Sequence, residues 1–281
     1  MSEWHKIGDE ETSVDPGDRG FQYGDGLFET IAIREGKARL WRYHVERLER
    51  GCERLDLNPP APAVLETSIE AALSGSSVDT SNCVAKIIVT AGVGERGYGR
   101  SSAEGTSVWV GIFPATAQQP DSYRRGVSVM MCKTRLAVGS PVAGIKTLNR
   151  IEQVLARSEC VREGVTEGLV RDAEGRVICG TMSNVFIVRD RQVMTPSLQR
   201  CGVAGVMRQK LLDELERIGT PAHVTDLFEA DLADADEIFI TNSQMGALPV
   251  HGCGSQRWAV GPVTRQAMQL LADCGVTECR L

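Results

Sequence analysis

The chain has 281 residues, of which 42% are hydrophobic and 24% are charged, and its formal net charge is −6 at pH 7. This composition is typical of a folded globular protein and excludes a disordered or collagen-like chain. The acidic balance argues against a nucleic-acid partner, and the lack of an apolar run of about 20 residues argues against a membrane protein.

The N-terminal part predicts a small α/β domain after an irregular opening. Apolar residues at helical spacing predict a helix over 41–57, which the proline-rich stretch 58–62 ends. A second helix is expected over 63–73. Apolar runs at 84–91 and 107–113 predict two strands, joined by a loop rich in glycine and arginine.

A segment of small and polar residues at 114–122 carries prolines and shows no periodicity, which indicates an interdomain linker. We therefore expect an N-terminal domain over 1–113 and a larger C-terminal domain over 123–281. The expected strands of the second domain are 126–132, a hairpin at 169–178, 183–188 and 237–241, and its expected helices are 149–163, 204–218 and 262–273. On the first of these helices, Ile151, Val154, Leu155, Ser158 and Val161 share one face.

Nine cysteines and four histidines are scattered along the chain, without a CxxC pair or clustered histidines. The sequence therefore predicts neither a metal site nor a disulfide framework, and most cysteines are expected to be reduced core residues. The opening residues lack the apolar stretch of a signal peptide. These features together predict a cytoplasmic protein.

Lysine is scarce, with six lysines against 25 arginines. Lys86 lies inside an apolar strand, and Lys146 lies in a short loop of small and apolar residues just before a helix. Burial lowers the pKa of an amine, which can make a lysine a nucleophile or a base. Either lysine could play that part, or could simply cover apolar surface.

Several groups could bind an anion. The stretch 202–208 opens a helix with two glycines, and free backbone amides at a helix start favour negative charge. Arg47 could supply an opposing cation, and Arg96 and Arg100 in the glycine-rich loop suit recognition of a carboxylate. A tight turn and ordinary surface charge are the alternative explanations. The sequence contains neither a nucleotide-binding fingerprint nor the GxSxG motif of serine hydrolases.

An ordered set of motifs extends over nearly the whole chain. Its members are DRGFQYGDGLFET at 18–30, HVERL at 44–48, RGY at 96–98, AGIKTLNRIEQVLAR at 143–157, SNVF at 183–186, GVMR at 205–208 and ADEIF at 235–239. On these motifs the chain resembles the fold-type IV pyridoxal-phosphate enzymes, the group of branched-chain and D-amino-acid aminotransferases. Within that group it is most similar to the 4-amino-4-deoxychorismate lyases.

The resemblance implies a two-domain α/β (α+β) fold, with a small N-terminal α/β domain and a larger C-terminal pseudo-barrel domain that carries the Schiff-base lysine. It also implies a pyridoxal 5'-phosphate cofactor and a homodimer whose partner subunit helps to wall the site. Carried over by position, it makes Lys146 the Schiff-base and catalytic lysine, with Lys86 away from it. The cofactor phosphate would be bound by Arg47, by the backbone amides of Val206 and Met207, and by Ser243.

The resemblance further implies that the small-molecule substrate contacts Thr30, Arg96 and Arg100. One position departs from the family pattern. Where the family usually has a glutamate that pairs with the pyridine nitrogen of the cofactor, this chain has Cys179. A carboxylate keeps that nitrogen protonated, whereas a thiol with a pKa of ~8.5 does so poorly. An enzyme with a weaker electron sink, an altered reaction and a catalytically impaired variant are the three possible consequences.

The implied activity is conversion of 4-amino-4-deoxychorismate to 4-aminobenzoate and pyruvate in folate biosynthesis. A D-amino-acid or branched-chain aminotransferase is the alternative enzyme. A cofactor-binding protein without turnover, impaired by Cys179, is a third possibility. The choice of substrate depends on the loop at 94–105 and on residues of the partner subunit, so the sequence leaves lyase and transaminase open.

Overall fold

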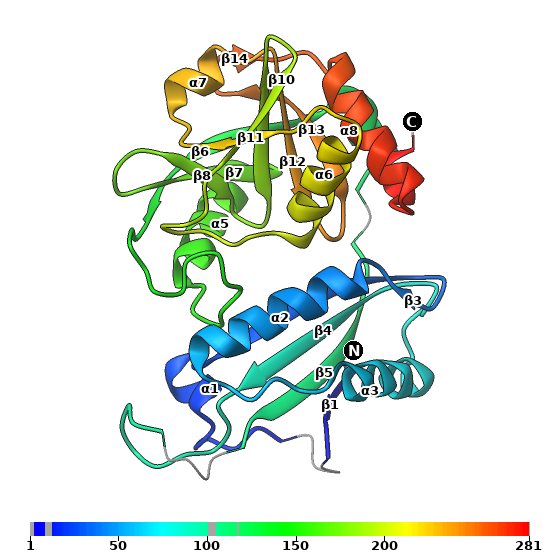
Figure 1. Ribbon diagram of the computed structural model, residues 1–281, viewed down its shortest axis with the longest axis vertical. Helices are drawn as coiled ribbons and strands as arrows, with labels where there is room; N and C mark the ends of the chain where they lie inside the picture. The colour runs from blue at the N-terminus through cyan, green and yellow to red at the C-terminus, as the bar shows by residue number, and fades with distance from the viewer. Residues whose placement is uncertain (1–2, 9–12, 101–104, 117, 281) are drawn as a thin grey trace. The chain divides into compact units, whose positions relative to one another are not determined.

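The computed structural model describes residues 3–8, 13–100, 105–116 and 118–280. The chain divides into two compact units, which are drawn in Figure 1. Unit 1 comprises Met1–Thr116 together with Ile145–Asn149, and unit 2 comprises Ala117–Gly144 together with Arg150–Leu281. The mixed α/β class expected from the sequence is confirmed.

Unit 1 contains, within the described residues, a five-stranded antiparallel sheet in the order β1-β5-β4-β2-β3. Its strands are β1 (Glu3–Lys6), β2 (Gly26–Arg34), β3 (Lys37–Ala38), β4 (Asn82–Thr90) and β5 (Ser107–Pro114). Its helices are α1 (Arg19–Tyr23), α2 (Trp41–Leu55) and α3 (Pro62–Gly75). The last two helices pack on one face of the sheet, where Leu48 and Ile69 meet Ile31 and Val110 in a single apolar core.

The irregular opening expected from the sequence is wrong. Residues 26–34 form β2, an interior strand that pairs with β4 over its whole length. Leu27, Ile31 and Ile33 point into the core, but a buried Glu29 interrupts the apolar positions of that face. The expected helices and strands between residues 41 and 113 are present, with ends that differ by at most two residues.

Unit 2 contains, in the part of the chain that the structure describes, a nine-stranded mixed sheet in the order β11-β10-β9-β12-β13-β6-β7-β8, with β14 paired to β13. The strands are β6 (Val127–Leu136), β7 (Glu167–Asp172), β8 (Val177–Gly180), β9 (Asn184–Arg189), β10 (Gln192–Pro196), β11 (His223–Thr225), β12 (Glu237–Asn242), β13 (Gly246–Cys253) and β14 (Gln256–Arg257). The sheet curls, because Val177 of β8 donates to the Leu227 carbonyl, just beyond β11. The expected pseudo-barrel is therefore confirmed.

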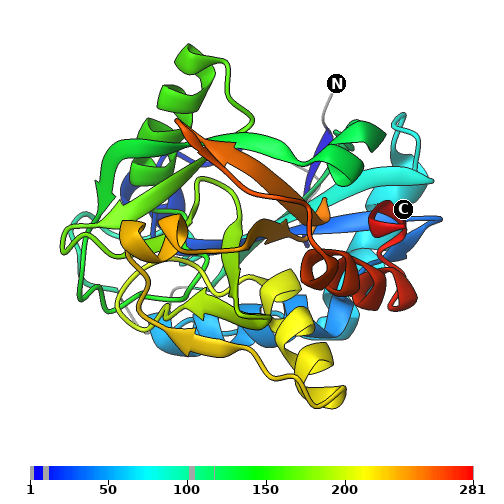
Figure 2. The same ribbon diagram turned by 90° about the horizontal axis from the view of Figure 1, so that it is seen from above.

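The helices of unit 2 are α4 (Pro120–Arg125), α5 (Ile151–Glu163), α6 (Val206–Arg217), α7 (Glu229–Ala233) and α8 (Pro262–Asp273), with a short 3-10 helix, η1 (Thr277–Cys279). α5 packs on β6 and β7, whereas α6 and α8 pack together and against β12 (Figure 2). None of the nine cysteines, all of which lie in described residues, is in a disulfide. Of the helices that the structure describes, none has the length and apolar character needed to cross a bilayer.

The expected linker at 114–122 contains the last residue of β5 and the start of α4. The boundary between the two units falls between Thr116 and Ala117. Ile145–Asn149 groups with unit 1 rather than with the residues around it, because its backbone is hydrogen-bonded to β2. The domains expected from the sequence, 1–113 and 123–281, stay a prediction. The division by contacts differs from them at Ile145–Asn149, which the sequence assigned to the second domain.

Candidate active site

Lys146, the residue expected to react, lies in the segment Ile145–Asn149 of unit 1. The Phe28 amide donates to the Lys146 carbonyl at 3.0 Å, and the Leu148 amide donates to the Gly26 carbonyl at 2.9 Å. The segment is thereby held along the start of β2. Lys146 Nζ lies 4.1 Å from the centroid of the Phe28 ring, so a cation–π contact holds the amine over an aromatic face.

A buried carboxylate beside this segment holds an arginine and a histidine side chain. Glu29 is 1% exposed and accepts from Arg47 Nε at 2.8 Å and from Arg47 Nη2 at 2.5 Å. Its second neighbour is His44 Nδ1, 2.6 Å from Oε2. Burial alone would raise the pKa of Glu29, but Arg47 and His44 outweigh it and lower the pKa to about 2. Glu29 is therefore ionised, and it fixes the orientation of the arginine expected to bind phosphate.

His44 is neutral in this arrangement. Burial lowers the pKa of His44, Glu29 opposes that effect, and the charges of Arg47 and Lys146 add to it. In the neutral ring Nδ1 carries the hydrogen that it donates to Glu29, so Nε2 is an acceptor. Nε2 is buried and has no hydrogen-bond partner within the described residues. The ring thus offers an unused acceptor inside unit 1.

Thr30 and Lys86 are cross-strand partners in the β2–β4 ladder. Since side chains two residues apart share a face of a strand, Phe28 lies on the same face as Thr30. Lys86 Nζ is 5.2 Å from the centroid of the Phe28 ring and 5.9 Å from that of Trp4, and burial lowers the pKa of Lys86. The expectation that Lys86 is remote from Lys146 is wrong, because both amines contact the same ring.

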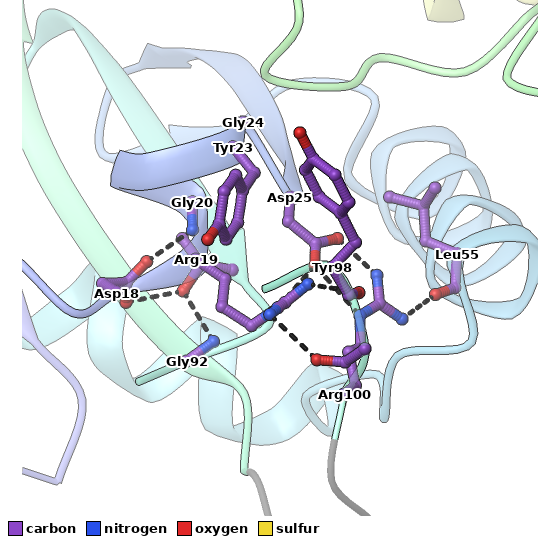
Figure 3. Close-up of polar contacts among 12 residues, drawn as sticks. Asp18, Arg19, Gly20, Tyr23, Gly24, Asp25, Leu55, Gly92, Tyr98 and Arg100 are labelled. Carbon is purple, nitrogen blue, oxygen red and sulfur yellow. Dashed lines mark hydrogen bonds and ion pairs between the residues drawn. The ribbon is translucent and has the colours of Figure 1, made fainter. Parts of the chain in front are cut away.

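Arg96 and Arg100, the two arginines expected to contact substrate, have different surroundings. Arg100 donates to both carboxylate oxygens of Asp25 and to the carbonyls of Leu55 and Asp56 (Figure 3). Arg96 is exposed, and it makes no hydrogen bond or ion pair with any described residue. Residues 101–104 of the same expected specificity loop lie outside the described residues.

In unit 2, Cys179 lies in β8 opposite Val170 of β7, at the end of the expected hairpin. Its side chain is buried. Burial raises the pKa of the Cys179 thiol to about 12, Cys201 and Glu167 add to the effect, and Arg150 opposes it. The thiol is therefore neutral at physiological pH, and it cannot pair as an anion with a protonated ring nitrogen.

Glu167 of β7 organises the turn between β8 and β9. Its buried carboxylate accepts from the amides of Gly168 at 2.9 Å and Thr181 at 3.0 Å, and from the hydroxyls of Ser183 at 2.8 Å and Thr181. Met182 N donates at 3.2 Å. These donors satisfy the Glu167 carboxylate and hold the turn in place. Glu167 therefore has a structural role and does not replace the glutamate that the family usually has at the position of Cys179.

The start of α6 carries Val206 and Met207, whose amides were expected to bind phosphate. Gly205 precedes them as the N-cap, and no side chain among the described residues caps the helix. A Cβ on Gly205 would overlap Asn184 Oδ1, while Asn184 Nδ2 donates to the Val203 carbonyl at 2.9 Å. This close approach seats the helix start against β9 and leaves its first amides available to an anion.

Ser243, the remaining expected phosphate contact, lies in the turn after β12. Asn242 Oδ1 accepts from the amides of Gln244 and Met245 at 2.9 Å each, and Asn242 Nδ2 donates to the Met182 carbonyl at 3.4 Å. The turn therefore lies beside the β8–β9 turn, and it belongs to the same part of unit 2 as Cys179 and the start of α6.

Unit 1 thus groups Lys146, Arg47 and Thr30, and unit 2 groups Cys179, Val206, Met207 and Ser243. Sequence reasoning missed three residues beside them: Glu29, Phe28 and Glu167. For Glu29 a signal existed, since it occupies an inward position between Leu27 and Ile31 of one strand, where a carboxylate needs partners. The role of Glu167 depends on a turn 14 residues further along the chain, which spacing alone does not reveal.

Comparisons with known proteins identify the family of the chain. A family model described as amino-transferase class IV matches residues 26–253. The chain is 38% identical over 261 residues to an aminodeoxychorismate lyase of Vibrio harveyi, covering 91% of this chain and 94% of that protein. It is 26% identical over 284 residues to a D-alanine aminotransferase of Listeria monocytogenes, covering 98% and 96%. The crystal structure of a 4-amino-4-deoxychorismate lyase from Pseudomonas aeruginosa shares 41% identity with a TM-score of 0.89, covering 96% and 98%.

Proposed function

This chain belongs to the amino-transferase class IV family, and we propose that it is the lyase that converts 4-amino-4-deoxychorismate to 4-aminobenzoate and pyruvate. The observation that carries the proposal is the similarity to two such lyases, at 38% and 41% identity over nearly the whole of each chain. The D-alanine aminotransferase of similar length is only 26% identical. The family is dependent on pyridoxal phosphate, in agreement with the cofactor expected from the sequence.

The chemistry of the donor set fits that cofactor at its aldehyde and at its phosphate. Lys146 supplies a primary amine, which is the group that condenses with an aldehyde. Arg47, held by Glu29, supplies a fixed cation. The uncapped amides of Val206 and Met207 and the hydroxyl of Ser243 are donors suited to a phosphate. At the ring nitrogen of the cofactor the partner would be the Cys179 thiol, which is neutral. The negative charge that a glutamate would place beside that nitrogen is therefore missing.

When bound, the cofactor supplies a conjugated ring that withdraws electrons from the amine-bearing carbon of the substrate. In this proposal the amine of Lys146 acts as the general base that removes the proton from that carbon. The enolpyruvyl ether bond of the substrate then breaks, and the substrate ring becomes aromatic. The protonated Lys146 amine can return the proton to the departing enolpyruvyl group, which leaves as pyruvate. Aromatisation supplies much of the driving force, so a lyase tolerates a weaker electron sink better than a transaminase does.

The substrate is a dicarboxylate, and unit 1 offers it cations and a hydroxyl. Arg96 is exposed and unpaired within the described residues, and the half-buried Lys86 amine lies beside Thr30 on the strand face that carries Phe28. A bound carboxylate compensates the desolvation of Lys86. This arrangement favours an anionic substrate with a flat ring over a small aliphatic amino acid.

The function is tested by supplying the purified protein and pyridoxal phosphate with 4-amino-4-deoxychorismate. We expect equal amounts of 4-aminobenzoate and pyruvate, and no product from Lys146→Ala. Incubation with D-alanine and 2-oxoglutarate tests the rival aminotransferase. Glutamate formed faster than 4-aminobenzoate would contradict the lyase assignment.

We also propose that the chain acts as a homodimer in the cytoplasm. The support for a dimer is the outer face of α5, which exposes four apolar side chains: Ile151 at 67%, Val154 at 56%, Leu155 at 54% and Val161 at 69%. One face of a helix with this much exposed apolar surface favours a protein partner, and a second copy of the chain supplies the same face. None of the nine cysteines is in a disulfide, which supports a reducing compartment.

A further inference from the structure

A buried guanidinium binds the glycine-rich loop between β4 and β5 to the rest of unit 1. Arg19, in α1, is 3% exposed. Its Nη1 donates to the carbonyls of Gly97 at 2.9 Å and Gly99 at 3.2 Å, and its Nη2 donates to the Tyr98 carbonyl at 2.9 Å (Figure 3). Three successive carbonyls therefore surround one cation, which fixes the backbone of the loop over these residues.

A single carboxylate compensates the charge of that guanidinium and of a second one. Asp25 Oδ2 accepts from Arg19 Nε at 3.0 Å and from Arg100 Nε at 3.0 Å, and Asp25 Oδ1 accepts from Arg100 Nη2. In Figure 3 Asp25 lies between the two guanidinium groups. Burial would raise the pKa of Asp25, but the hydrogen bonds and charges of Arg100 and Arg19 lower it. Asp25 is thus an anion shared by two arginines.

Arg100 extends the connection to α2. Its Nη1 donates to the carbonyls of Leu55 and Asp56, at the C-terminal end of that helix, where a cation is favourable. α2 bears Arg47, and β2, which begins directly after Asp25, bears Phe28. We call Arg19, Asp25 and Arg100 the loop clamp, since they join the loop to the two elements that carry unit 1 site residues.

Aromatic contacts reinforce the loop clamp. The Arg19 guanidinium lies 5.1 Å from the centroid of the Tyr23 ring, and Tyr23 packs edge-on against Tyr98 with centroids 5.5 Å apart. The Gly97 amide donates to the Tyr23 hydroxyl at 3.3 Å. Tyr98 itself is largely exposed, so this packing serves the loop rather than the core.

The two arginines that were expected to bind substrate differ in their relation to the loop clamp: Arg100 is part of it and Arg96 is not. Every nitrogen of the Arg100 guanidinium donates to a protein oxygen. Arg96, directly before the clamped carbonyls, makes no such contact with any residue that the structure describes. The guanidinium of Arg100 is therefore fully hydrogen-bonded within the protein. Of the two arginines, Arg96 is the one that can bind a carboxylate of the substrate.

We propose that Asp25 is a positioning residue for substrate binding, because the loop clamp fixes the backbone of residues 97–99 and so presents Arg96 to a carboxylate of the substrate. The proposal rests on the proposed function only in naming that substrate. It assigns Asp25, Arg19 and Arg100 to affinity rather than to the chemical step. Loss of the clamp then raises KM and leaves kcat nearly unchanged.

The test compares Arg100→Gln and Asp25→Asn with the wild-type protein and with Glu46→Gln. Glu46 forms an exposed ion pair with Arg42 on α2 and is the matched control. In protein without substrate, trypsin cleavage after Arg96 is followed by mass spectrometry, since a clamped backbone resists a protease. In the loaded enzyme, KM and kcat for 4-amino-4-deoxychorismate are measured.

We expect both clamp variants to be cleaved after Arg96 about tenfold faster than the wild type, and their KM to rise about tenfold with kcat within about twofold. Glu46→Gln should match the wild type in the cleavage rate, in KM and in kcat. Arg96→Gln should reproduce the rise in KM. Should Asp25→Asn fail to fold, Arg100→Gln, whose side chain is 28% exposed, carries the test.

Unchanged cleavage together with unchanged KM in Arg100→Gln overturns the proposal, and so does a fall in kcat at constant KM. The outcome is separable from the proposed function. If the wild-type protein makes no 4-aminobenzoate, the proposed function fails, while the rate of trypsin cleavage still decides whether the clamp holds the loop.

Discussion

Glu29 shows how one buried side chain sets the charge of its surroundings. Its carboxylate holds Arg47 and His44, and the lysine expected to react contributes to the depressed pKa of His44. With Glu29 ionised, Arg47 charged and His44 neutral, these three side chains together carry no net charge. The lysine expected to react, Lys146, therefore has a neutral ring, not a second carboxylate, as a neighbour on α2.

This arrangement predicts a stability that falls in acid. The pKa of Glu29 is lowered from 4.5 to about 2, so its ionised form contributes roughly 3 kcal/mol above pH 4.5, and that contribution is lost as the pH falls toward 2. His44, whose pKa is also lowered, acts in the same direction below pH 6.5, because only the unfolded chain readily takes up its proton.

Glu29→Gln should therefore lower stability by about 3 kcal/mol near pH 7, since it leaves Arg47 buried beside a neutral group. It should also remove the part of the pH dependence between pH 4.5 and 2. Urea unfolding at several pH values measures both effects, with the exposed Glu46→Gln as the control. A variant that keeps the full acid sensitivity of the wild type would show that Glu29 is not its source.

Cys179 decides how strong an electron sink the enzyme can offer. Its neutral thiol, with a pKa of about 12, cannot hold a proton on the ring nitrogen of the cofactor, whereas a carboxylate can. For Cys179→Glu we expect transamination to rise about tenfold while the lyase rate changes by less than about threefold, because aromatisation already drives the lyase reaction. Arg150, which already opposes the pKa shift of the thiol, would help to keep the new carboxylate ionised.

The two rates are measured with D-alanine plus 2-oxoglutarate and with 4-amino-4-deoxychorismate. Cys179→Ser is the matched control, since it keeps a small neutral group at the position and should leave both rates close to those of the wild type. A loss of lyase rate in Cys179→Glu without a gain in transamination would count against the weak-sink explanation. A wild-type protein that binds the cofactor but turns over neither substrate would favour the third possibility, a binding protein.

Among the elements, α6 depends on a glycine at its N-cap. A Cβ at Gly205 would overlap Asn184 Oδ1, so Gly205→Ala must displace either Asn184 or the start of the helix. Because the amides of Val206 and Met207 then move, we expect the affinity for pyridoxal phosphate to fall about tenfold. Titration of the apoprotein by absorbance gives the Kd. Gly75→Ala in α3, where a Cβ meets nothing within 4 Å, should not change the Kd.

The elements between residues 41 and 113 were predictable because each carries a local signal. α2 has an apolar stripe ended by prolines, and β4 and β5 are runs of apolar and β-branched residues. β2 was missed, since its inward face includes Glu29, whose burial depends on Arg47 and His44 of another element. The expected site residues came from motifs, whereas their supports, such as Glu167 and the loop clamp, depend on contacts that spacing does not encode.

For the molecule as a whole, α5 carries the prediction on assembly. Periodicity placed Ile151, Val154, Leu155 and Val161 on one face, and that face is exposed in the single chain. The buried side chains of the helix are Ala156, Glu159 and Cys160. Burial of this face against a second copy predicts that Leu155→Glu lowers the mass in solution from that of two chains to that of one.

Light scattering coupled to size-exclusion chromatography measures that mass. Val64→Glu, on an exposed position of α3, is the control and should leave the mass unchanged. If Leu155→Glu keeps the mass of the wild type, α5 is not the dimer interface. If the wild type already has the mass of one chain, the homodimer proposal is wrong.

The central claim is that the amine of Lys146 binds the cofactor covalently. The most direct measurement is reduction of the protein with borohydride in the presence of pyridoxal phosphate, followed by mapping of the modified peptide by mass spectrometry. We predict one modified lysine, Lys146, and loss of the modification in Lys146→Ala. A modification on Lys86 instead, or a protein that gains no visible absorbance when the cofactor is added, would contradict the account.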